Sequence, residues 1–276
     1  MSQKIFALTG AGAVLCSTLV EALAKQGHKI AVIDLKKEAA DKVADKINAN
    51  GGIAIGVVAN VLEKESLEAA KKEVYEKLGF CDILINGAGG NHPLGTTSNP
   101  YFELEDLKNT AEGFKTFFDL DTAGIQFTFN LNFIGTLLPT QVFAKDMVGR
   151  QGCSILNISS MNAFTPLTKI PAYNGAKAAV SNFTQWLAVH FSKVGIRVNA
   201  LAPGFFLTDQ NRALLTEADG SLTPRGNTII GQTPMGRFGE PEDLVGTTLW
   251  LCSEGVSFVT GVVVPIDGDF SAFSGV

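Results

Sequence analysis

A tyrosine and a lysine stand four residues apart in the segment PAYNGAK, residues 171–177. On a helix this spacing places the side chains of Tyr173 and Lys177 on one face. A phenol can act as a general acid or base, and a neighbouring ammonium group favours its ionised form. The same pair also suits the solvent-exposed edge of an amphipathic helix. The residues before and after the segment must therefore decide between a catalytic and a structural interpretation.

A glycine-rich turn in LTGAGAVLC, residues 8–16, is the second chemical feature of the chain. It lies between an expected strand and an expected helix, where the pyrophosphate of a dinucleotide rests on the helix N-terminus. Gly10 can form the tight turn, and Gly12 lets the backbone approach a phosphate. Leu15 occupies the third glycine position of the general G-x-G-x-x-G pattern, so the turn alone is weak evidence.

Asp34 supports the same dinucleotide interpretation, because it ends the next expected strand, 24 residues after Gly10. A carboxylate at that place can accept hydrogen bonds from the adenosine ribose and repel a 2′-phosphate. A solvated acid in a turn is the alternative. Lys36 and Lys37 follow Asp34 and tolerate some phosphate, so the sequence favours NAD(H) over NADP(H) without requiring it.

Short β-branched runs alternate with longer helical stretches along the chain. Strands that are apolar on both faces and alternate with helices imply a parallel sheet covered on both sides. Right-handed crossovers then build an α/β fold, a doubly wound Rossmann-type sheet of about seven strands in a single domain over 1–276. The expected strands are 4–10, 28–34, 52–59, 81–87, 153–159, 196–202 and 262–268, and the expected helices are 13–26, 37–50, 63–78 and 171–194, with a long irregular stretch between residues 87 and 153.

The composition fits one large core. The 276 residues are 46% hydrophobic, with a net charge of −5 and a mean hydropathy of +0.20. No basic surface for nucleic acid and no membrane span is expected. The four cysteines and three histidines are scattered, which predicts neither a disulfide frame nor a metal site. We read the N-terminus as strand, turn and helix instead of a cleaved leader, and expect a cytoplasmic protein.

The chain resembles the short-chain dehydrogenase/reductase family over nearly its whole length. The resemblance is strong because seven motifs occur in the family's order on the expected elements. The motifs are TGAGAVL at 9–15, NGAG at 86–89, NFIG at 132–135, NISS at 157–160, YNGAK at 173–177, APGFFLT at 202–208, and GRFGEPEDL at 236–244 with FVTGVVVPIDG at 258–268.

This resemblance implies a catalytic set of Asn132, Ser160, Tyr173 and Lys177. Tyr173 would be the general acid or base, and Ser160 would orient the substrate oxygen. Lys177 would hold the nicotinamide ribose, and Asn132 would anchor a water relay to it. A free tyrosine has a pKa near 10, and catalysis near neutrality needs a value lower by roughly 2–3 units. An ammonium about 4 Å away supplies about 4 kcal/mol at an effective dielectric of ~20, so we expect Lys177 to lower the pKa of Tyr173.

The resemblance also implies a set of cofactor-binding residues. The loop from Pro203 to Thr208 would cover the nicotinamide. The adenosine side would be lined by Asn86, Ala88 and Gly89, with Asn60 and Val61 near the adenine, in addition to Gly10, Gly12, Leu15 and Asp34. The chain departs from the family at Val14 and Cys16, which replace glycines, at Asn60, which replaces aspartate, and at Asp269, which replaces glycine.

Two segments are expected to shape the substrate side. Residues 91–126 form an unusually long connection at the sheet edge where ligands bind, and residues 205–233 form a lid. Amides suit hydroxyl groups, and a guanidinium can grip a carboxylate with two hydrogen bonds. A surface histidine and a solvated arginine remain open alternatives for two of the candidates. The candidate substrate ligands are His92, Asn162, Asn211 and Arg212, together with Asn91 and Gln210.

These polar groups favour a polyhydroxylated acid over a steroid or an acyl chain. The strings GGNHP, SSMNAF and APGFFLTDQNR resemble the family branch of D-mannonate oxidoreductases, or fructuronate reductases. That branch implies an NAD(H)-dependent enzyme that interconverts D-fructuronate and D-mannonate, most commonly as a homotetramer. The alternatives are a gluconate 5-dehydrogenase-like enzyme, a reductase of a ketone on an apolar scaffold, and a non-catalytic NAD sensor with an altered glycine turn.

Overall fold

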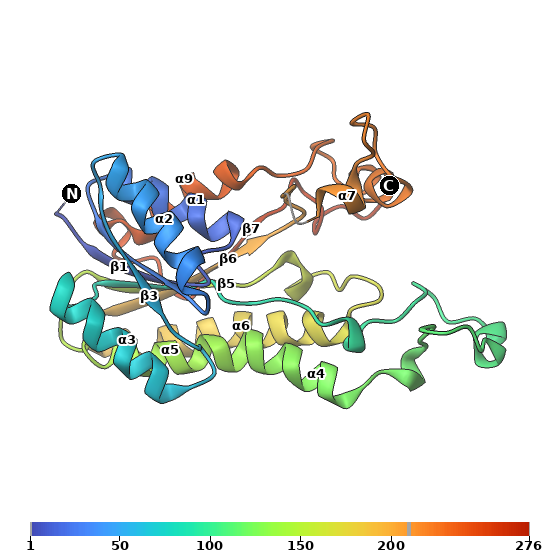
Figure 1. The fold of residues 1–276 in the computed structure, drawn as a ribbon, viewed down its shortest axis with the longest axis horizontal. Helices are drawn as coiled ribbons and strands as arrows, with labels where there is room; N and C mark the ends of the chain where they lie inside the picture. Colours follow the sequence, from blue (N-terminus) through green and yellow to red (C-terminus); the bar gives the residue numbers. More distant parts are fainter. Residues whose placement is uncertain (1, 209–210, 276) are drawn as a thin grey trace.

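The computed structural model describes residues 2–208 and 211–275. They form one domain in which a parallel sheet lies between two layers of helices (Figure 1). Over this part of the chain the strands pair in the order β3-β2-β1-β4-β5-β6-β7, and each pair is parallel. The predicted doubly wound sheet of seven strands is therefore confirmed. The strands are β1 (Ile5–Thr9), β2 (Lys29–Asp34), β3 (Ile53–Val58), β4 (Ile83–Asn86), β5 (Cys153–Ile158), β6 (Ile196–Pro203) and β7 (Val263–Ile266).

Alternate residues of the strands face opposite helix layers, because successive side chains of a strand point to opposite faces. In β1, Phe6 and Leu8 belong to one buried cluster and Ala7 belongs to the other. Both faces are apolar for this reason, which is the pattern that the sequence showed. The first layer contains α1 (Val14–Lys25), α2 (Lys37–Ala49) and α9 (Val245–Cys252), and the second contains α3 (Lys64–Lys77), α5 (Gly135–Ala144) and α6 (Pro171–His190).

Residues 122–144 are helical, which corrects the expectation of an irregular stretch between the fourth and fifth strands. Helix α4 (Thr122–Phe129) continues through a π-helical turn, η4 (Asn130–Ile134), into α5. Polar and apolar residues alternate from Gln126 to Phe133, which is a strand pattern, and Pro139 lies within α5. These two features hide the helix in the sequence.

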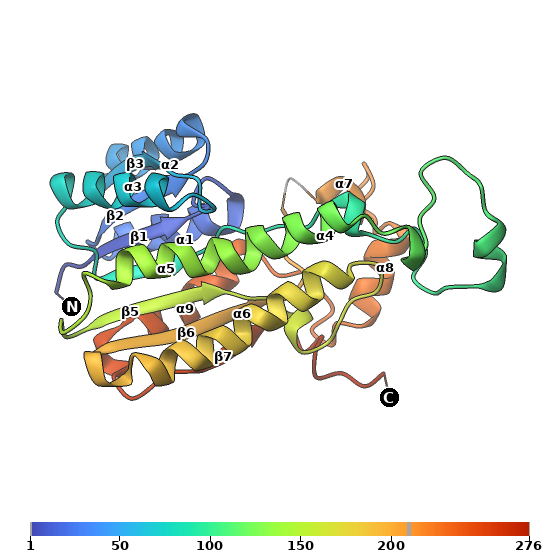
Figure 2. The same ribbon diagram turned by 90° about the horizontal axis from the view of Figure 1, so that it is seen from below.

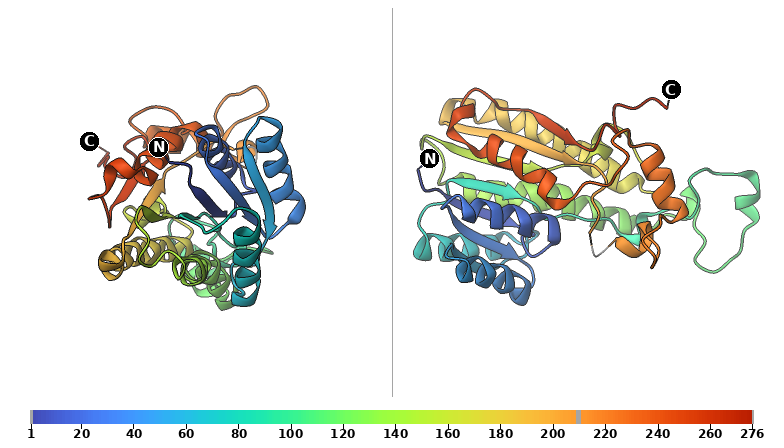
Figure 3. Two further views of the ribbon diagram at one scale, coloured as in Figure 1. Left: turned by 90° about the vertical axis from the view of Figure 1, so that its left-hand side faces the viewer. Right: turned by 90° about the horizontal axis from the view of Figure 1, so that it is seen from above.

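The connection before α4 forms an arm, residues 97–119, that projects beyond the sheet (Figures 2 and 3). It contains the short 3-10 helices η2 (Leu104–Lys108) and η3 (Phe117–Asp119), neither of which has a buried residue. Thr97 N donates to Lys169 O at 2.9 Å and ties the base of the arm to the segment before α6. The large apolar side chains that the arm exposes are Tyr101, Phe102, Leu104, Leu107, Phe117 and Phe118.

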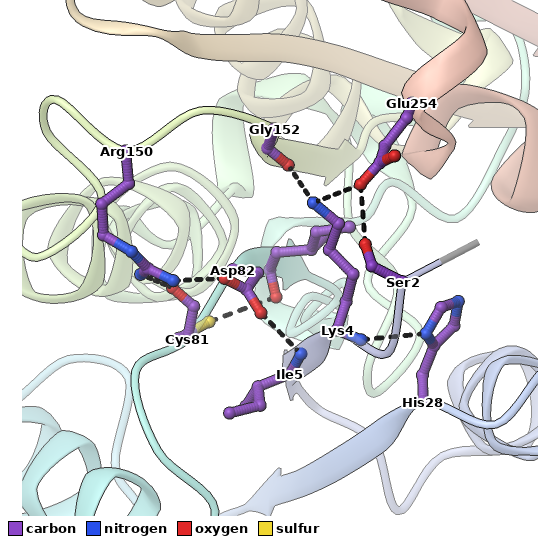
Figure 4. Close-up of polar contacts among 10 residues, drawn as sticks. Ser2, Lys4, Ile5, His28, Cys81, Asp82, Arg150, Gly152 and Glu254 are labelled. Atoms are coloured by element: carbon purple, nitrogen blue, oxygen red, sulfur yellow. Dashed lines mark hydrogen bonds and ion pairs between the residues drawn. The ribbon is translucent and has the colours of Figure 1, made fainter.

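Charged residues are paired at the amino ends of the strands (Figure 4). Lys4 Nζ lies 3.0 Å from Glu254 Oε1, and Asp82 forms an ion pair with Arg150. Asp82 Oδ2 also accepts a hydrogen bond from Ile5 N at 2.9 Å. These contacts join the start of β1 to the turns before β4 and β5 and to the short 3-10 helix η8 (Glu254–Val256). In the described residues no helix is both long and apolar enough to span a bilayer.

Candidate active site

A cavity of about 300 Å³ opens at the carboxyl ends of the central strands. It lies beside β1 and β4, where the strand order reverses and where ligands of doubly wound sheets bind. Three of the four residues proposed for catalysis line it, together with parts of the glycine turn and of the loop after β6. The predicted site residues that line it are Leu15, Gly89, Ser160, Tyr173, Lys177, Pro203, Thr208 and Asn211.

Tyr173 and Lys177 share one face of α6, as the four-residue spacing predicts. Lys177 Nζ lies 5.6 Å from the centroid of the Tyr173 ring and donates a hydrogen bond to Ile158 O at 2.8 Å. Lys177 is only 4% exposed. Burial lowers the pKa of its ammonium group from 10.5 to about 8, because the charged form loses its hydration.

The expectation that Lys177 lowers the pKa of Tyr173 is wrong for this arrangement. Burial raises the pKa of the phenol, and a hydrogen bond with Ser160 offsets part of the rise. The lysine ammonium faces the tyrosine ring and the Ile158 carbonyl. At neutral pH Tyr173 therefore carries its proton, which suits a general acid.

Ser160 precedes the short 3-10 helix η5 (Met161–Ala163) and caps it. Its Oγ accepts a hydrogen bond from Asn162 N at 3.3 Å and donates one to Asn162 Oδ1 at 3.2 Å. Ser160 is 7% exposed, so these contacts hold its hydroxyl in place at the wall of the cavity. The end of β5 and the first turn of α6 thus bring Ser160 to Tyr173.

Asn132 lies in the π-helical turn η4 and is fully buried. Its Nδ2 donates to Gly90 O and to Thr128 O, each at 2.7 Å, and its Oδ1 accepts from Gly90 N at 3.2 Å. A Cβ atom built on Gly89 would lie 2.7 Å from Asn132 Oδ1 and 3.1 Å from Lys177 Nζ. The missing side chain of Gly89 therefore allows both polar groups to approach the same point behind the cavity.

The glycine turn has the close backbone approach that a dinucleotide site requires. Gly10 has a φ of +67°, and a Cβ atom there would lie 2.9 Å from the Ala88 backbone. Gly12 N donates to Asp34 Oδ2 at 3.0 Å, and Lys36 N donates to Asp34 Oδ1 at 3.1 Å. The turn and the end of β2 are thereby locked together beside the N-terminus of α1. These features fit a nucleotide cofactor.

Cys16 explains how the chain manages without the usual glycine in this turn. Its thiol packs against Gly87, where an added Cβ atom would lie only 2.6 Å from the sulfur. Burial raises the pKa of the thiol to about 12, so Cys16 is a neutral packing group. The absence of a side chain at Gly87 therefore leaves room for the larger residue at position 16. Val14, in the first turn of α1, also lines the cavity.

Several predicted cofactor ligands use their side chains within the protein. Asn60 begins the turn before α3, where its Oδ1 accepts from Leu62 N and its Nδ2 donates to Glu63. Asn86 is buried and donates to Thr140 and Asn157. Any contact of these two asparagines with the adenosine half must therefore come largely from the backbone. Val61 is also buried.

The predicted substrate ligands occupy different surroundings. His92 Nδ1 accepts from Leu94 N at 3.1 Å and its ring packs on Phe127. Asn211 closes the loop after β6, since its Oδ1 accepts from Thr208 N and its Nδ2 donates to a backbone carbonyl, that of residue 206. Arg212 is exposed at the start of the short helix α7 (Arg212–Leu215). Gln210 lies outside the described residues, and Asn91 donates to Thr96.

Asn174 was not singled out from the sequence, although it follows Tyr173 directly. Its Oδ1 accepts from Asn162 Nδ2 at 2.9 Å, and its Nδ2 donates to Leu167 O at 2.7 Å. Its position next to Tyr173, in the first turn of α6, was the signal in the sequence that could have identified it as part of the site.

Phe205 and Phe206, in the loop after β6, also line the cavity.

A doubly wound sheet, a locked glycine turn, and a cavity that holds a phenol, a hydroxyl and a buried lysine define a nicotinamide-dependent oxidoreductase of CH–OH groups. The sequence model of the short chain dehydrogenase family matches residues 4–219 of this chain. The chain belongs to this family.

Similar proteins are found in Haemophilus influenzae and in Burkholderia cenocepacia. An "uncharacterized oxidoreductase" from Haemophilus influenzae is 59% identical over 277 residues, which cover 100% of this chain and 96% of that protein. A crystal structure of a proposed D-mannonate oxidoreductase from Haemophilus influenzae with bound NAD has a TM-score of 0.94 and 59% identity, covering 99% and 96% of the two chains. A gluconate 5-dehydrogenase from Burkholderia cenocepacia J2315, solved with NADP and tartrate, has a TM-score of 0.81 and 28% identity, covering 99% and 97%.

Proposed function

We propose that this protein is an NAD(H)-dependent oxidoreductase of sugar acids, with D-fructuronate and D-mannonate as its substrate pair. The observation that carries the proposal is the convergence of Ser160, Tyr173 and Lys177 on one cavity, with Asn132 behind it. The similarity to a proposed D-mannonate oxidoreductase over 99% of the chain supports the choice of substrate. The relative solved with tartrate, a hydroxylated acid, supports the same substrate class.

In this proposal Tyr173 donates its proton to the carbonyl oxygen during reduction and takes it back during oxidation. The nicotinamide supplies the hydride in one direction and accepts it in the other. Ser160 donates a hydrogen bond to the same substrate oxygen and fixes its position. Lys177 binds the nicotinamide ribose, and Asn132 supports the proton path to Lys177 from behind Gly89. A phenol that is protonated at neutral pH matches the reductive direction.

Asp34 is the proposed reason for a preference for NAD(H). Two backbone N–H groups hold its carboxylate beside the glycine turn, where a negative charge repels a 2′-phosphate. We expect kcat/KM to be at least about 10-fold higher for NADH than for NADPH, and Asp34→Ala to reduce this ratio. Steady-state kinetics with both cofactors test this. Equal use of the two cofactors by the native protein would contradict it.

The substrate assignment is tested with purified protein, D-fructuronate and NADH. Absorbance at 340 nm is expected to fall, and Tyr173→Phe is the matched control that should stop the fall. A panel containing 5-keto-D-gluconate separates the gluconate 5-dehydrogenase-like alternative. The proposal fails if the protein oxidises NADH with none of these acids.

A ketone on an apolar scaffold is the second candidate substrate. Phe205 and Phe206 line the cavity and would contact such a scaffold. A higher kcat/KM for an apolar ketone than for any sugar acid would select this alternative. A non-catalytic NAD sensor would bind NADH but oxidise it with no carbonyl compound. Tyr173→Phe would leave the function of such a sensor intact.

We further propose that residues 205–233 act as a lid and that the protein is a homotetramer. Thr208 and Asn211 contribute to the cavity wall, which supports the lid. The arm exposes six large apolar side chains that its own chain leaves uncovered, and such surfaces commonly mark contacts between proteins. Sedimentation velocity tests the assembly. A single monomeric species would refute the tetramer.

A further inference from the structure

Phe205 stands between two cavities. On one side lies the catalytic cavity of about 300 Å³. On the other side lies a second cavity of about 370 Å³, whose wall includes Met235, Arg237 and Asp267. Phe205 lines both cavities, so its ring separates the space proposed for the substrate from the space behind the loop.

Phe206 also lines both cavities, but its ring is fixed in place. It is only 5% exposed, and a Cβ atom built on Gly239 would lie 2.8 Å from its ring. Backbone bonds hold the same stretch, since Gly239 N donates to Phe205 O and Leu207 N donates to Gly239 O, each at 2.9 Å. Phe206 therefore has little room to turn, whereas the ring of Phe205 is half-buried and lies beside the second cavity.

Phe270, near the C-terminus, packs on Phe205. The two ring centroids lie 5.3 Å apart, and the ring planes meet at 71°. Aromatic pairs favour this edge-to-face arrangement. Within the described part of the chain it is the one ring contact that Phe205 makes. The position of the Phe205 ring therefore depends on Phe270.

A turn holds Phe270 in place. Asp267 Oδ1 accepts from Asp269 N at 3.1 Å, and Asp267 Oδ2 accepts from Ser271 N at 3.0 Å. Phe270 N donates to Asp267 O at 3.2 Å. Thr165 Oγ1 donates to Ser271 O at 3.3 Å, which ties the turn to the segment that follows η5. Phe270 is thus anchored by the hydrogen bonds of its own turn.

We propose that Phe270 is a positioning residue that sets the size of the substrate, because it holds the Phe205 ring between the two cavities. The inference rests on the proposed function, since it takes the catalytic cavity as the place of the substrate. With Phe270 present, the cavity accepts a small hydroxylated acid. Without Phe270 the Phe205 ring turns toward the second cavity, and the joined space admits a carbonyl compound on a bulky apolar scaffold.

Two substrates of different size test this role. D-fructuronate is the small acid, and 2-decalone is the bulky apolar ketone. In Phe270→Ala the KM of D-fructuronate should rise about 3- to 10-fold, which is the range that one aromatic pair supplies. The kcat/KM for 2-decalone should increase in the same variant. The kcat with D-fructuronate and the Kd of NADH should each change less than about 2-fold.

Three further variants distinguish positioning from general damage to the loop. Phe270→Tyr keeps the ring and should keep the native KM. Phe273→Ala is the matched control and should also keep it, since Phe273 belongs to the same segment, is exposed and makes no ring contact within the described residues. If Phe270 acts through Phe205, then Phe205→Ala and the double variant Phe205→Ala/Phe270→Ala should have the same KM. A native KM in Phe270→Ala, additive effects in the double variant, or an equal rise in the Kd of NADH would overturn the inference.

A measurement without substrate separates this inference from the proposed function. Phe205→Trp adds one tryptophan to the two of the native chain, so labelling with 5-fluorotryptophan gives one further ¹⁹F signal. Phe270→Ala should shift the signal from position 205, and Phe273→Ala should leave it in place. If the native protein oxidises NADH with neither compound nor with 5-keto-D-gluconate, the proposed function fails, and the ¹⁹F signal still decides whether Phe270 holds position 205. If the native protein reduces D-fructuronate while Phe270→Ala changes neither the KM nor the ¹⁹F signal, only the role of Phe270 is wrong.

Discussion

The two edges of the sheet treat charge in opposite ways. At the amino edge Lys4 pairs with Glu254 and Asp82 pairs with Arg150 (Figure 4). At the carboxyl edge Lys177 donates to a backbone carbonyl, and the described residues lining its cavity include no carboxylate. Charges are neutralised where they join elements of the fold. The charge of Lys177, which the proposed chemistry needs, is buried with no ion-pair partner among the described residues, and burial lowers its pKa to about 8.

The largest expected effect is on catalysis at the carboxyl edge. Tyr173→Phe removes the proposed general acid, which typically contributes 10²–10⁴-fold, so kcat should fall about 10³-fold. Only one hydrogen bond, with Ser160, is lost, so stability should change by no more than about 1 kcal/mol. Single-turnover kinetics and thermal melts measure the two effects. A fully active Tyr173→Phe variant would remove the contrast between the edges.

Lys177→Met should sharpen the comparison through its pH dependence. The folded pKa of Lys177 is about 8 against an ordinary 10.5, so between these values the unfolded chain binds more protons than the folded one. The free energy of unfolding of the native protein should therefore rise with pH across this window, by about 3 kcal/mol relative to Lys177→Met. Urea denaturation at pH 7.5 and pH 10.5 measures the difference. Parallel pH curves for the two proteins would contradict it.

The smallest effects are expected at the amino edge, where the loss should affect stability alone. Asp82→Asn leaves Arg150 without its partly buried partner and should cost about 2 kcal/mol. Glu254→Gln acts on a side chain that is 54% exposed and should cost less than about 0.5 kcal/mol. Urea denaturation ranks the two variants, with kcat unchanged in both. A larger cost for Glu254→Gln would reverse the expected order.

The sheet could be predicted from the sequence because burial on both faces leaves a simple mark, a continuous apolar run. The four-residue spacing predicted that Tyr173 and Lys177 share one helix face, and the resemblance to the family pointed to the glycine turn and Ser160 at the ends of their strands. Helix α4 and its π-helical turn could not, since tertiary packing overrides a pattern that alternates with period two. The buried strands could therefore be predicted from the sequence more easily than the helix that connects β4 to β5.

The direction of the Tyr173 pKa shift also lay beyond the sequence. A spacing of four residues states that Lys177 is near Tyr173, but not that its ammonium group faces the ring and a carbonyl. Asparagines raise the same difficulty. Asn60, Asn162 and Asn211 were recognised as polar groups near the site, whereas their partners within the protein became known only from the fold.

The π-helical turn at Asn130–Ile134 has a consequence for insertions and deletions. A wide turn of this kind holds one residue more than a regular helix needs over the same length. Deleting one residue there would let the backbone relax into an uninterrupted α-helix, while the side chains of α4 and α5 would keep the faces that they now pack with. Only the residues of the turn itself would move, and the amide of Asn132 would leave Gly90. A shortened protein of this kind would be well folded and yet misaligned at that one position.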